Sequence, residues 1–276
     1  MALDAFFLNG SAGRLFALLI RPAGAPSGSE GRSVIYCPPF AEEANRTRRA
    51  AVLLGRRLAG IGVATLIVDP YGTGDSDGDF SDARLSIWQD DLRITADWLS
   101  AQGMDHIGLL GVRLGACVAT RYAADCDRAL ERLVLWQPVV RGSAFLTQFL
   151  RLKAAHSLIA TGTGASTKEL REMLEGGQSL EIAGYTLSSK LFADVDGIDL
   201  KQDAVPSVDR VDWLEITAEG RDAISVPSQA VVGRWSEAGI STSATAVNGQ
   251  RYWETVEIAV PHELLDATVE AFQSAP

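Results

Sequence analysis

The stretch that decides the fold is His106-Ile-Gly-Leu-Leu-Gly-Val-Arg-Leu-Gly-Ala-Cys117. Its apolar start predicts a buried strand over residues 106–111, and residues 114–124 predict a helix. Gly111 and Gly115 lie on either side of the junction and indicate a tight turn from strand to helix. We expect glycine at both positions because a side chain at either one would collide with the neighbouring strand or helix.

Outward from this turn, apolar strands and amphipathic helices alternate between Ser33 and Val140. The predicted strands are 33–37, 63–69, 106–111 and 130–136, and the predicted helices span about 51–61, 85–99 and 114–124. Strands that are apolar throughout and separated by helices predict an α/β fold with a mostly parallel sheet and right-handed crossovers. The two leading strands, 5–8 and 14–21, are expected to pair antiparallel at its edge.

The alternation breaks over residues 141–207, where helices are predicted at 143–157 and 167–174 and no strand is apparent. We expect a helical lid there, inserted over the C-terminal edge of the sheet. The pattern then resumes, with strands predicted at 212–217 and 253–260 and helices at 228–238 and 262–272. We therefore expect one domain, residues 1–276, with a lid insertion at about 141–207.

Composition narrows the classes of function. The 276 residues include 25 basic and 35 acidic side chains, a net charge of −10 that argues against nucleic acid or an anionic membrane as the main partner. No apolar run reaches the ~18 residues of a membrane span. The three cysteines form no C-x-x-C pair, so neither a disulfide framework nor a zinc site is indicated. We expect a cytoplasmic protein without a metal or cofactor.

The turn at Gly111–Gly115 has the frame of a nucleophile elbow, G-x-S-x-G, which pushes its central residue out above the sheet. Here the central residue is Arg113. Arginine stays protonated at any working pH, so it cannot attack a carbonyl carbon. The chain therefore cannot carry out acyl transfer by the usual Ser–His–Asp mechanism.

Together with this turn, two loops resemble the α/β-hydrolase superfamily. Asp69-Pro-Tyr-Gly-Thr-Gly-Asp-Ser-Asp-Gly78 is similar to its loop before the second sheet-covering helix, and Pro38-Pro39-Phe40 takes the place of its oxyanion loop. The resemblance implies the α/β-hydrolase fold. It also implies that Asp222 is the acid and His262 the base of the triad, since elbow, acid and histidine follow in that order. Glu219 is an alternative acid.

A narrower resemblance rests on Pro39-Phe-Ala-Glu-Glu-Ala-Asn-Arg-Thr-Arg-Arg49, Gly74-Asp-Ser-Asp-Gly-Asp-Phe80 and Gly111-Val-Arg-Leu-Gly-Ala116. These motifs are similar to the exosortase A system-associated hydrolases, type 2. That resemblance implies a bacterial accessory role beside exopolysaccharide and protein-sorting genes, an arginine at the elbow as part of the group's pattern, and a second hydrolase of the same system as a partner.

The positive charge of Arg113 at a helix N-terminus and the strained backbone of its turn both cost free energy, so we expect another interaction to offset these costs. Glu42 and Glu43 lie in the oxyanion loop, and we expect one of them to form a bidentate pair with Arg113. The two triad residues also have purely structural alternatives. Asp222 could be a turn or N-cap residue, and His262 could be an ordinary residue at a helix start.

Two functions follow. In one, the chain hydrolyses an acyl ester or thioester: Arg113 binds an anionic group of the substrate, His262 acts as general base, and the backbone N–H groups of Phe40 and Leu114 stabilise developing charge. In the other, the chain is a pseudoenzyme that binds an anionic small molecule or a protein partner without turnover.

Other polar clusters have simpler explanations. Ser76 is expected to fix its loop. The acidic run around it lacks the glycine that a calcium loop needs, because Phe80 stands there. The cluster of Arg46, Arg48 and Arg49 fits a solvated helix start, or else a gate that attracts an anion.

Overall fold

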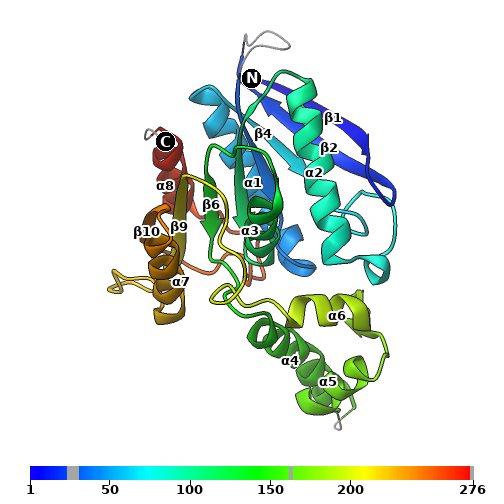
Figure 1. Cartoon of the computed structure of the whole chain (residues 1–276). Helices are drawn as coiled ribbons and strands as arrows, with labels where there is room; N and C mark the ends of the chain where they lie inside the picture. Colours follow the sequence, from blue (N-terminus) through cyan, green and yellow to red (C-terminus); the bar gives the residue numbers. More distant parts are fainter. Residues whose placement is uncertain (24–30, 162–163, 274–276) are drawn as a thin grey trace.

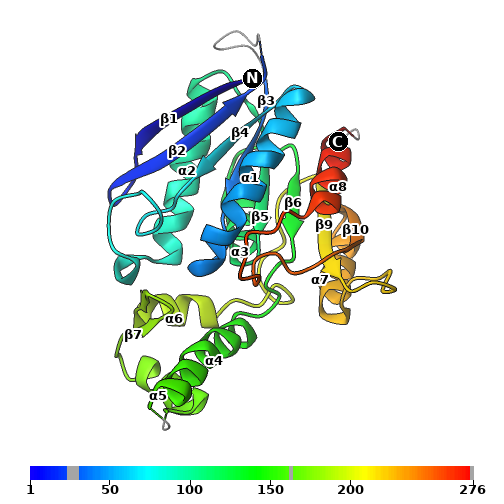
Figure 2. The same cartoon turned by 180° about the vertical axis from the view of Figure 1, so that it is seen from behind.

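The computed structural model describes residues 1–23, 31–161 and 164–273, without the side chains of 156–161. Eight strands form one sheet in the order β1-β2-β4-β3-β5-β6-β9-β10 (Figures 1 and 2). They are β1 (Ala2–Asn9), β2 (Arg14–Arg21), β3 (Arg32–Cys37), β4 (Val63–Val68), β5 (His106–Val112), β6 (Leu133–Trp136), β9 (Arg210–Thr217) and β10 (Ser241–Asn248). From β4 to β10 all neighbours are parallel, whereas β1 and β2 pair antiparallel at one edge as predicted.

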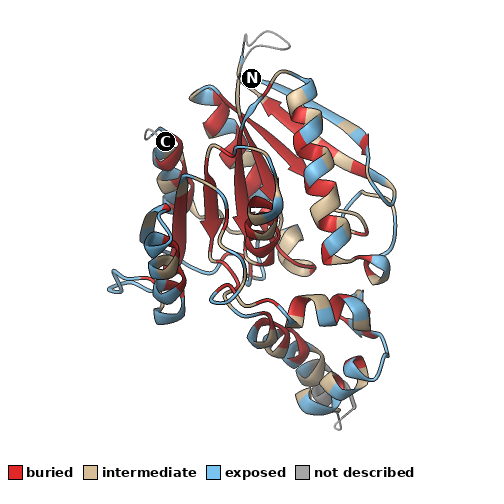
Figure 3. Ribbon diagram, in the orientation of Figure 1, coloured by how far each residue is buried: buried red, intermediate tan, exposed pale blue. Residues whose placement is uncertain are grey.

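The helices cover both faces of the sheet (Figures 1 and 2). On one face, α1 (Glu42–Gly60) packs with α8 (His262–Gln273) over a shared apolar cluster. On the other, α2 (Leu85–Ala101), α3 (Leu114–Asp125) and α7 (Val226–Glu237) cover a second cluster. The central strands β3, β4, β5, β6 and β9 are buried from both sides, whereas the edge strands β1 and β10 are largely exposed (Figure 3). The predicted fold class is confirmed, since the sheet is mostly parallel with helices on both faces.

The register of the sheet brings several loops to one edge. Cys37 pairs with Gly111, and Val112 pairs with Trp136, which in turn pairs with Leu214. Chain segments that follow β3, β5 and β6 therefore leave the sheet side by side, where ligands bind in open α/β sheets.

Beyond this edge lies the segment between β6 and β9 (Figures 1 and 2). It comprises α4 (Gly142–Thr161), α5 (Thr167–Glu175), a hairpin of β7 (Leu180–Ile182) and β8 (Tyr185–Leu187), and α6 (Ser189–Asp196). A short 3₁₀ helix, η1 (Phe80–Asp82), precedes α2. The hairpin was not predicted, because strands of three residues are too short to show an alternating pattern.

The last strand of the sheet differs from the prediction. It is β10, Ser241–Asn248, and residues 253–260 form no strand. Of the apolar residues that suggested a strand there, Trp253 is buried, but Val256 and Ile258 are 96% and 54% exposed. β10 is an edge strand with a polar sequence, so it lacks the apolar run that marks a buried strand.

Every helix in the described part of the chain is too short or too polar to span a lipid bilayer. Cys37, Cys117 and Cys126 are all free thiols.

The two glycines of the central turn have the close approaches predicted for them. A Cβ on Gly115 would lie well inside 3.0 Å of the carbonyl oxygens of Cys37 and Pro38, and one on Gly111 equally close to the backbone of Ala116. The turn therefore packs backbone against backbone, and only glycine fits at either position.

This packing gives the first testable prediction. Gly115→Ala lowers the free energy of unfolding by about 3 kcal/mol or more, because backbone atoms of β3 cannot move aside. The control is Gly233→Ala within α7, where an added Cβ meets nothing within 4 Å. That change stabilises by about 0.5–1 kcal/mol through helix propensity. Urea unfolding measures the change in unfolding free energy for both variants. Equal changes would contradict the claim that the turn has no room for a side chain at residue 115.

Candidate functional site

The structure centres the candidate site on Arg113, at the junction of β5 and α3. Its backbone has φ 54° and ψ −114°, in the left-handed region that L-residues avoid. The turn is held by the Arg113 N–H, which donates to the Trp136 carbonyl at 2.9 Å. Such a conformation costs about 1–3 kcal/mol and projects the side chain above the sheet. Residue 113 therefore occupies an elbow at the end of a central strand.

Arg113 forms an ion pair with Glu43, in the first turn of α1. Its Nε and Nη2 both lie 3.3 Å from Glu43 Oε1, and its Nη1 lies 3.5 Å from the carbonyl oxygen of Gln137. The two side chains are only 13% and 19% exposed. The predicted pair is confirmed for Glu43. Its geometry differs from a bidentate fork because one oxygen accepts both contacts.

Glu42, the other predicted partner, pairs with Arg46 one turn along α1. Glu43 Oε2 is buried and has no hydrogen-bond partner within the described part of the chain. Burial therefore raises the pKa of Glu43, and the neighbouring Arg113 charge offsets only part of that rise.

Two aromatic rings complete the surroundings of the guanidinium. Its carbon lies 5.0 Å from the centroid of the Trp253 ring and 5.7 Å from that of Phe145. The faces of the two rings attract the positive charge of the guanidinium, which is largely shielded from water. The sequence predicts Trp253 to lie in a strand. It lies in a loop instead, and the loop places its ring against the guanidinium of Arg113.

Arg113 stands between two cavities. The apolar cavity, of about 220 Å³, is lined by Phe40, Glu42, Glu43, Arg46, Arg113, Phe145, Gln148, Phe149, Leu152, Trp253 and Glu254. The polar cavity, of about 540 Å³, is lined by Arg113, Gln137, Gln148, Glu215, Ile216, Thr217, Ala218, Arg221, Ser225, Gly249, Arg251, Trp253 and Glu254. They share Arg113, Gln148, Trp253 and Glu254, so they lie next to each other, and we refer to the two cavities together as the cleft.

His262 does not belong to this cleft. It is exposed at the start of α8, and its Nδ1 lies 3.1 Å from Nη2 of Arg57. Arg57 is in the last turn of α1 and Glu43 in the first, a separation of about 21 Å along the helix axis. The expectation that His262 is the base beside Arg113 is therefore corrected. The expectation depended on a strand at residues 253–260 that would lead to His262 at the site. These residues form no strand.

The acid candidates also lie outside the cleft walls. Asp222 and Glu219 are both exposed, and neither lines the polar cavity. Their neighbours Arg221 and Ser225 do line it, as does Glu215 within β9. Among the described side chains no histidine lines either cavity, so the cleft contains no acid–histidine pair.

Comparison with known proteins identifies the family of the chain. Residues 29–179, more than half of the chain, match the hydrolase family described as serine aminopeptidase, S33. The chain belongs to this family. No curated protein matches it.

Solved structures of low sequence identity share the fold of this S33-family chain. Est1E from Butyrivibrio proteoclasticus, solved with ferulic acid bound, superposes with a TM-score of 0.66 at 19% identity, covering 98% of each chain. Mouse α/β-hydrolase domain-containing protein 10 gives 0.60 at 16%, again with 98% of each chain covered. An α/β serine hydrolase without a lid from Xanthomonas campestris gives 0.57 at 18%, covering 99% of this chain and 93% of that one.

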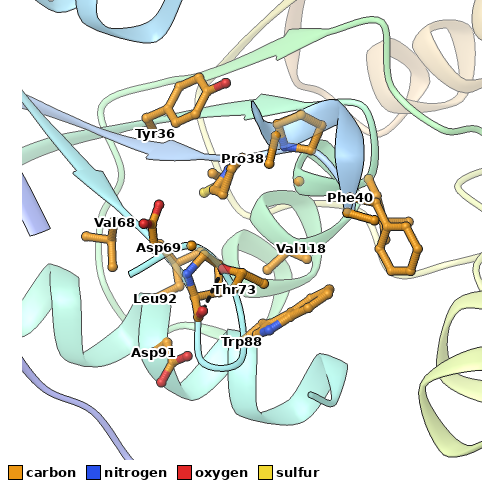
Figure 4. A pocket seen from close by; sticks show the side chains of 18 of the residues that line it. Tyr36, Pro38, Phe40, Val68, Asp69, Thr73, Trp88, Asp91, Leu92 and Val118 are labelled. Atoms are coloured by element: carbon orange, nitrogen blue, oxygen red, sulfur yellow. Dashed lines mark hydrogen bonds between the residues drawn. The ribbon is translucent and has the colours of Figure 1, made fainter. Parts of the chain in front are cut away.

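A third cavity, of about 60 Å³, lies beside the elbow between the ends of β3 and β4 and helix α2 (Figure 4). Phe40 and Leu114, the predicted donors of backbone N–H groups, both line it and are themselves buried. Asp91 is 2% exposed and accepts a hydrogen bond from the Tyr71 N–H at 2.9 Å. Burial raises the pKa of Asp91 to about 6.

The remaining polar candidates have structural roles. Ser76 fixes its loop as predicted: its hydroxyl donates to the Asp69 carbonyl and accepts from the Phe16 N–H. Asp77 is engaged by Arg14. In the described part of the chain no group of acidic, histidine or cysteine side chains is placed to hold a metal ion. Of the basic cluster, Arg46 pairs with Glu42 and Arg48 with Asp69.

The ion pair predicts an asymmetry between its partners. Arg113→Met leaves the Glu43 carboxylate buried without a cation and lowers the free energy of unfolding by about 2–4 kcal/mol. Glu43→Gln costs less, because burial already favours a neutral group at residue 43 and the guanidinium keeps its aromatic contacts. Urea unfolding at pH 7 compares the two. A larger cost for Glu43→Gln would contradict this account.

Asp91 predicts a pH dependence of stability. Its folded pKa of about 6 lies above the ordinary value of 3.8, so the folded state binds more protons between these values. Its contribution to stability therefore falls as pH rises, by about 2 kcal/mol between pH 4 and pH 8. The difference in unfolding free energy between wild type and Asp91→Asn isolates this effect. A difference that is independent of pH would contradict it.

Proposed function

We propose that this S33-family chain binds a small anionic ligand non-covalently at Arg113 and does not carry out acyl transfer. The observation that carries the proposal is the elbow itself. A guanidinium held by Glu43 stands where the fold positions a nucleophile, and no described histidine lines the cleft. Residue 113 therefore offers no attacking oxygen, and the described side chains of the cleft offer no histidine base.

The guanidinium retains an edge for a ligand. Nε and Nη2 face Glu43, whereas the only partner of Nη1 among the described residues is the Gln137 carbonyl oxygen at 3.5 Å, at the long limit of a hydrogen bond. Arginine carries five N–H donors in a fixed fork, so its Nη1–Nη2 edge can bind a carboxylate or phosphate while the first edge holds Glu43.

The charges of the two cavities indicate the side on which an anion binds. The wall of the polar cavity carries three arginines, Arg113, Arg221 and Arg251, and two glutamates. The wall of the apolar cavity carries two arginines and three glutamates. An anion is therefore stabilised on the polar side of Arg113.

Hydrolysis of an acyl ester or thioester, the other function considered for this sequence, lacks support in the cleft. We predict that the wild type hydrolyses short and long acyl esters and thioesters no faster than buffer. Arg113→Ser is predicted to stay inactive as well, because a new serine would have no described histidine to take its proton. Burst-phase and steady-state assays test both proteins. Turnover that Arg113→Ser increases would contradict the proposal.

Anion binding is tested by titrating acetate and inorganic phosphate, followed by thermal unfolding and calorimetry. The wild type is expected to be stabilised in a concentration-dependent way. Arg113→Lys keeps a charge but loses the planar fork, and its affinity is expected to fall about tenfold or more. The control, Arg93→Met, removes an exposed arginine paired with Asp90 on α2 and is expected to leave binding unchanged. Equal binding by the wild type and Arg113→Lys would overturn the proposal.

We also propose that the chain belongs to the exosortase-associated group within the family. Two of the motifs that suggest it, 39–49 and 111–116, contain the two partners of the ion pair, Glu43 and Arg113. The pair gives a physical reason for both motifs to occur in one chain. A partner hydrolase of the same system would co-purify with the chain from its native host, and repeated failure to do so would count against that partner.

A further inference from the structure

We propose that the ligand is a hydroxylated carboxylate of monosaccharide size, bound in the polar cavity with its carboxylate on Arg113 and a hydroxyl group donating to Glu215. This inference rests on the proposed anion binding and names the class of ligand.

Glu215 is an acceptor that lacks a donor. It lies in β9, is 6% exposed, and forms part of the wall of the polar cavity. Its Oε1 accepts a hydrogen bond from the Ser225 N–H at 3.0 Å. Its Oε2 is buried and has no hydrogen-bond partner in the described part of the chain. An ionised carboxylate can only accept, and leaving a buried acceptor unpaired is costly. In this proposal the Glu215 carboxylate turns Oε2, which has almost no exposed surface in the free protein, toward the cavity to meet the ligand's hydroxyl group.

Other groups around the cavity supply donors. The side-chain oxygen of Gln137 accepts from the Ile216 N–H at 2.7 Å, which leaves the amide NH₂ of Gln137 as a donor. Gln148, Arg221 and Arg251 also line this cavity and carry N–H groups. A wall that offers both donors and acceptors fits hydroxyl groups, because each hydroxyl donates and accepts.

Charge and size favour this class over two others. An ammonium group could also donate to Glu215, but three arginines against two glutamates disfavour a cationic ligand. An alkyl carboxylate would satisfy Arg113 and leave Glu215 without a donor. The cavity, about 540 Å³, lies in the range of about 300–1,000 Å³ typical of small-molecule sites.

The test compares matched ring compounds by isothermal titration calorimetry. Glucuronate carries a carboxylate and hydroxyl groups on a six-membered ring, cyclohexanecarboxylate carries only the carboxylate, and glucose lacks the carboxylate. The wild type is expected to bind glucuronate about tenfold or more tighter than either of the others. Glu215→Gln, which replaces one acceptor oxygen by a donor, is expected to remove the advantage over cyclohexanecarboxylate. Glu237→Gln, an exposed change at the end of α7, is the control and leaves it intact.

The outcomes separate this inference from the function on which it rests. If cyclohexanecarboxylate binds as tightly as glucuronate, the hydroxyl contact is overturned and anion binding stands. If glucose binds as tightly as glucuronate, anion binding at Arg113 is overturned. If none of the three binds, both fail. The comparison in the wild type decides the matter even where Glu215→Gln does not fold.

Discussion

A single partly buried ion pair governs the site. Arg113 is forced above the sheet by a strained turn, and its charge stands at the N-terminus of α3, where a cation is disfavoured by about 0.3–1 kcal/mol. Glu43 offsets this from the first turn of α1, where a carboxylate is favoured. Ala41, just before α1, also has a left-handed backbone, with φ 51°. Of the four non-glycine residues with positive φ in the described part of the chain, two therefore stand immediately before the helices that hold the pair, and a third, Gln137, has its carbonyl oxygen 3.5 Å from Arg113 Nη1.

The frame of the fold could be predicted from the sequence because its signals are local. Gly111 and Gly115 fix a backbone approach that admits no side chain, and the apolar strands before and after them fix the sheet. The ion pair could be predicted only as a choice between Glu42 and Glu43. Neighbouring helix residues point about 100° apart, and the sequence does not set the phase of a helix against a distant turn.

The rest could not be predicted because tertiary context overrode local pattern. Residues 253–260 have the apolar composition of a strand, but the edge of the sheet was taken by the polar β10. That exchange moved Trp253 onto the guanidinium and left His262 at the far end of α1. Glu215 lies within a strand that was predicted correctly, yet nothing in its sequence marks a buried carboxylate with one oxygen unpaired.

The chain keeps the scaffold of its hydrolase family and places a guanidinium at the elbow. The account depends on one claim, that the guanidinium of Arg113 is held by Glu43 on one edge and receives an anion on the other. NMR of arginine side-chain Nε–Hε groups tests this most directly, with the Arg113 signal assigned by its loss in Arg113→Lys. The account predicts a signal protected from exchange at neutral pH that moves saturably as acetate is added. A signal that stays in place while other arginines respond, or one that exchanges freely with water, would contradict it.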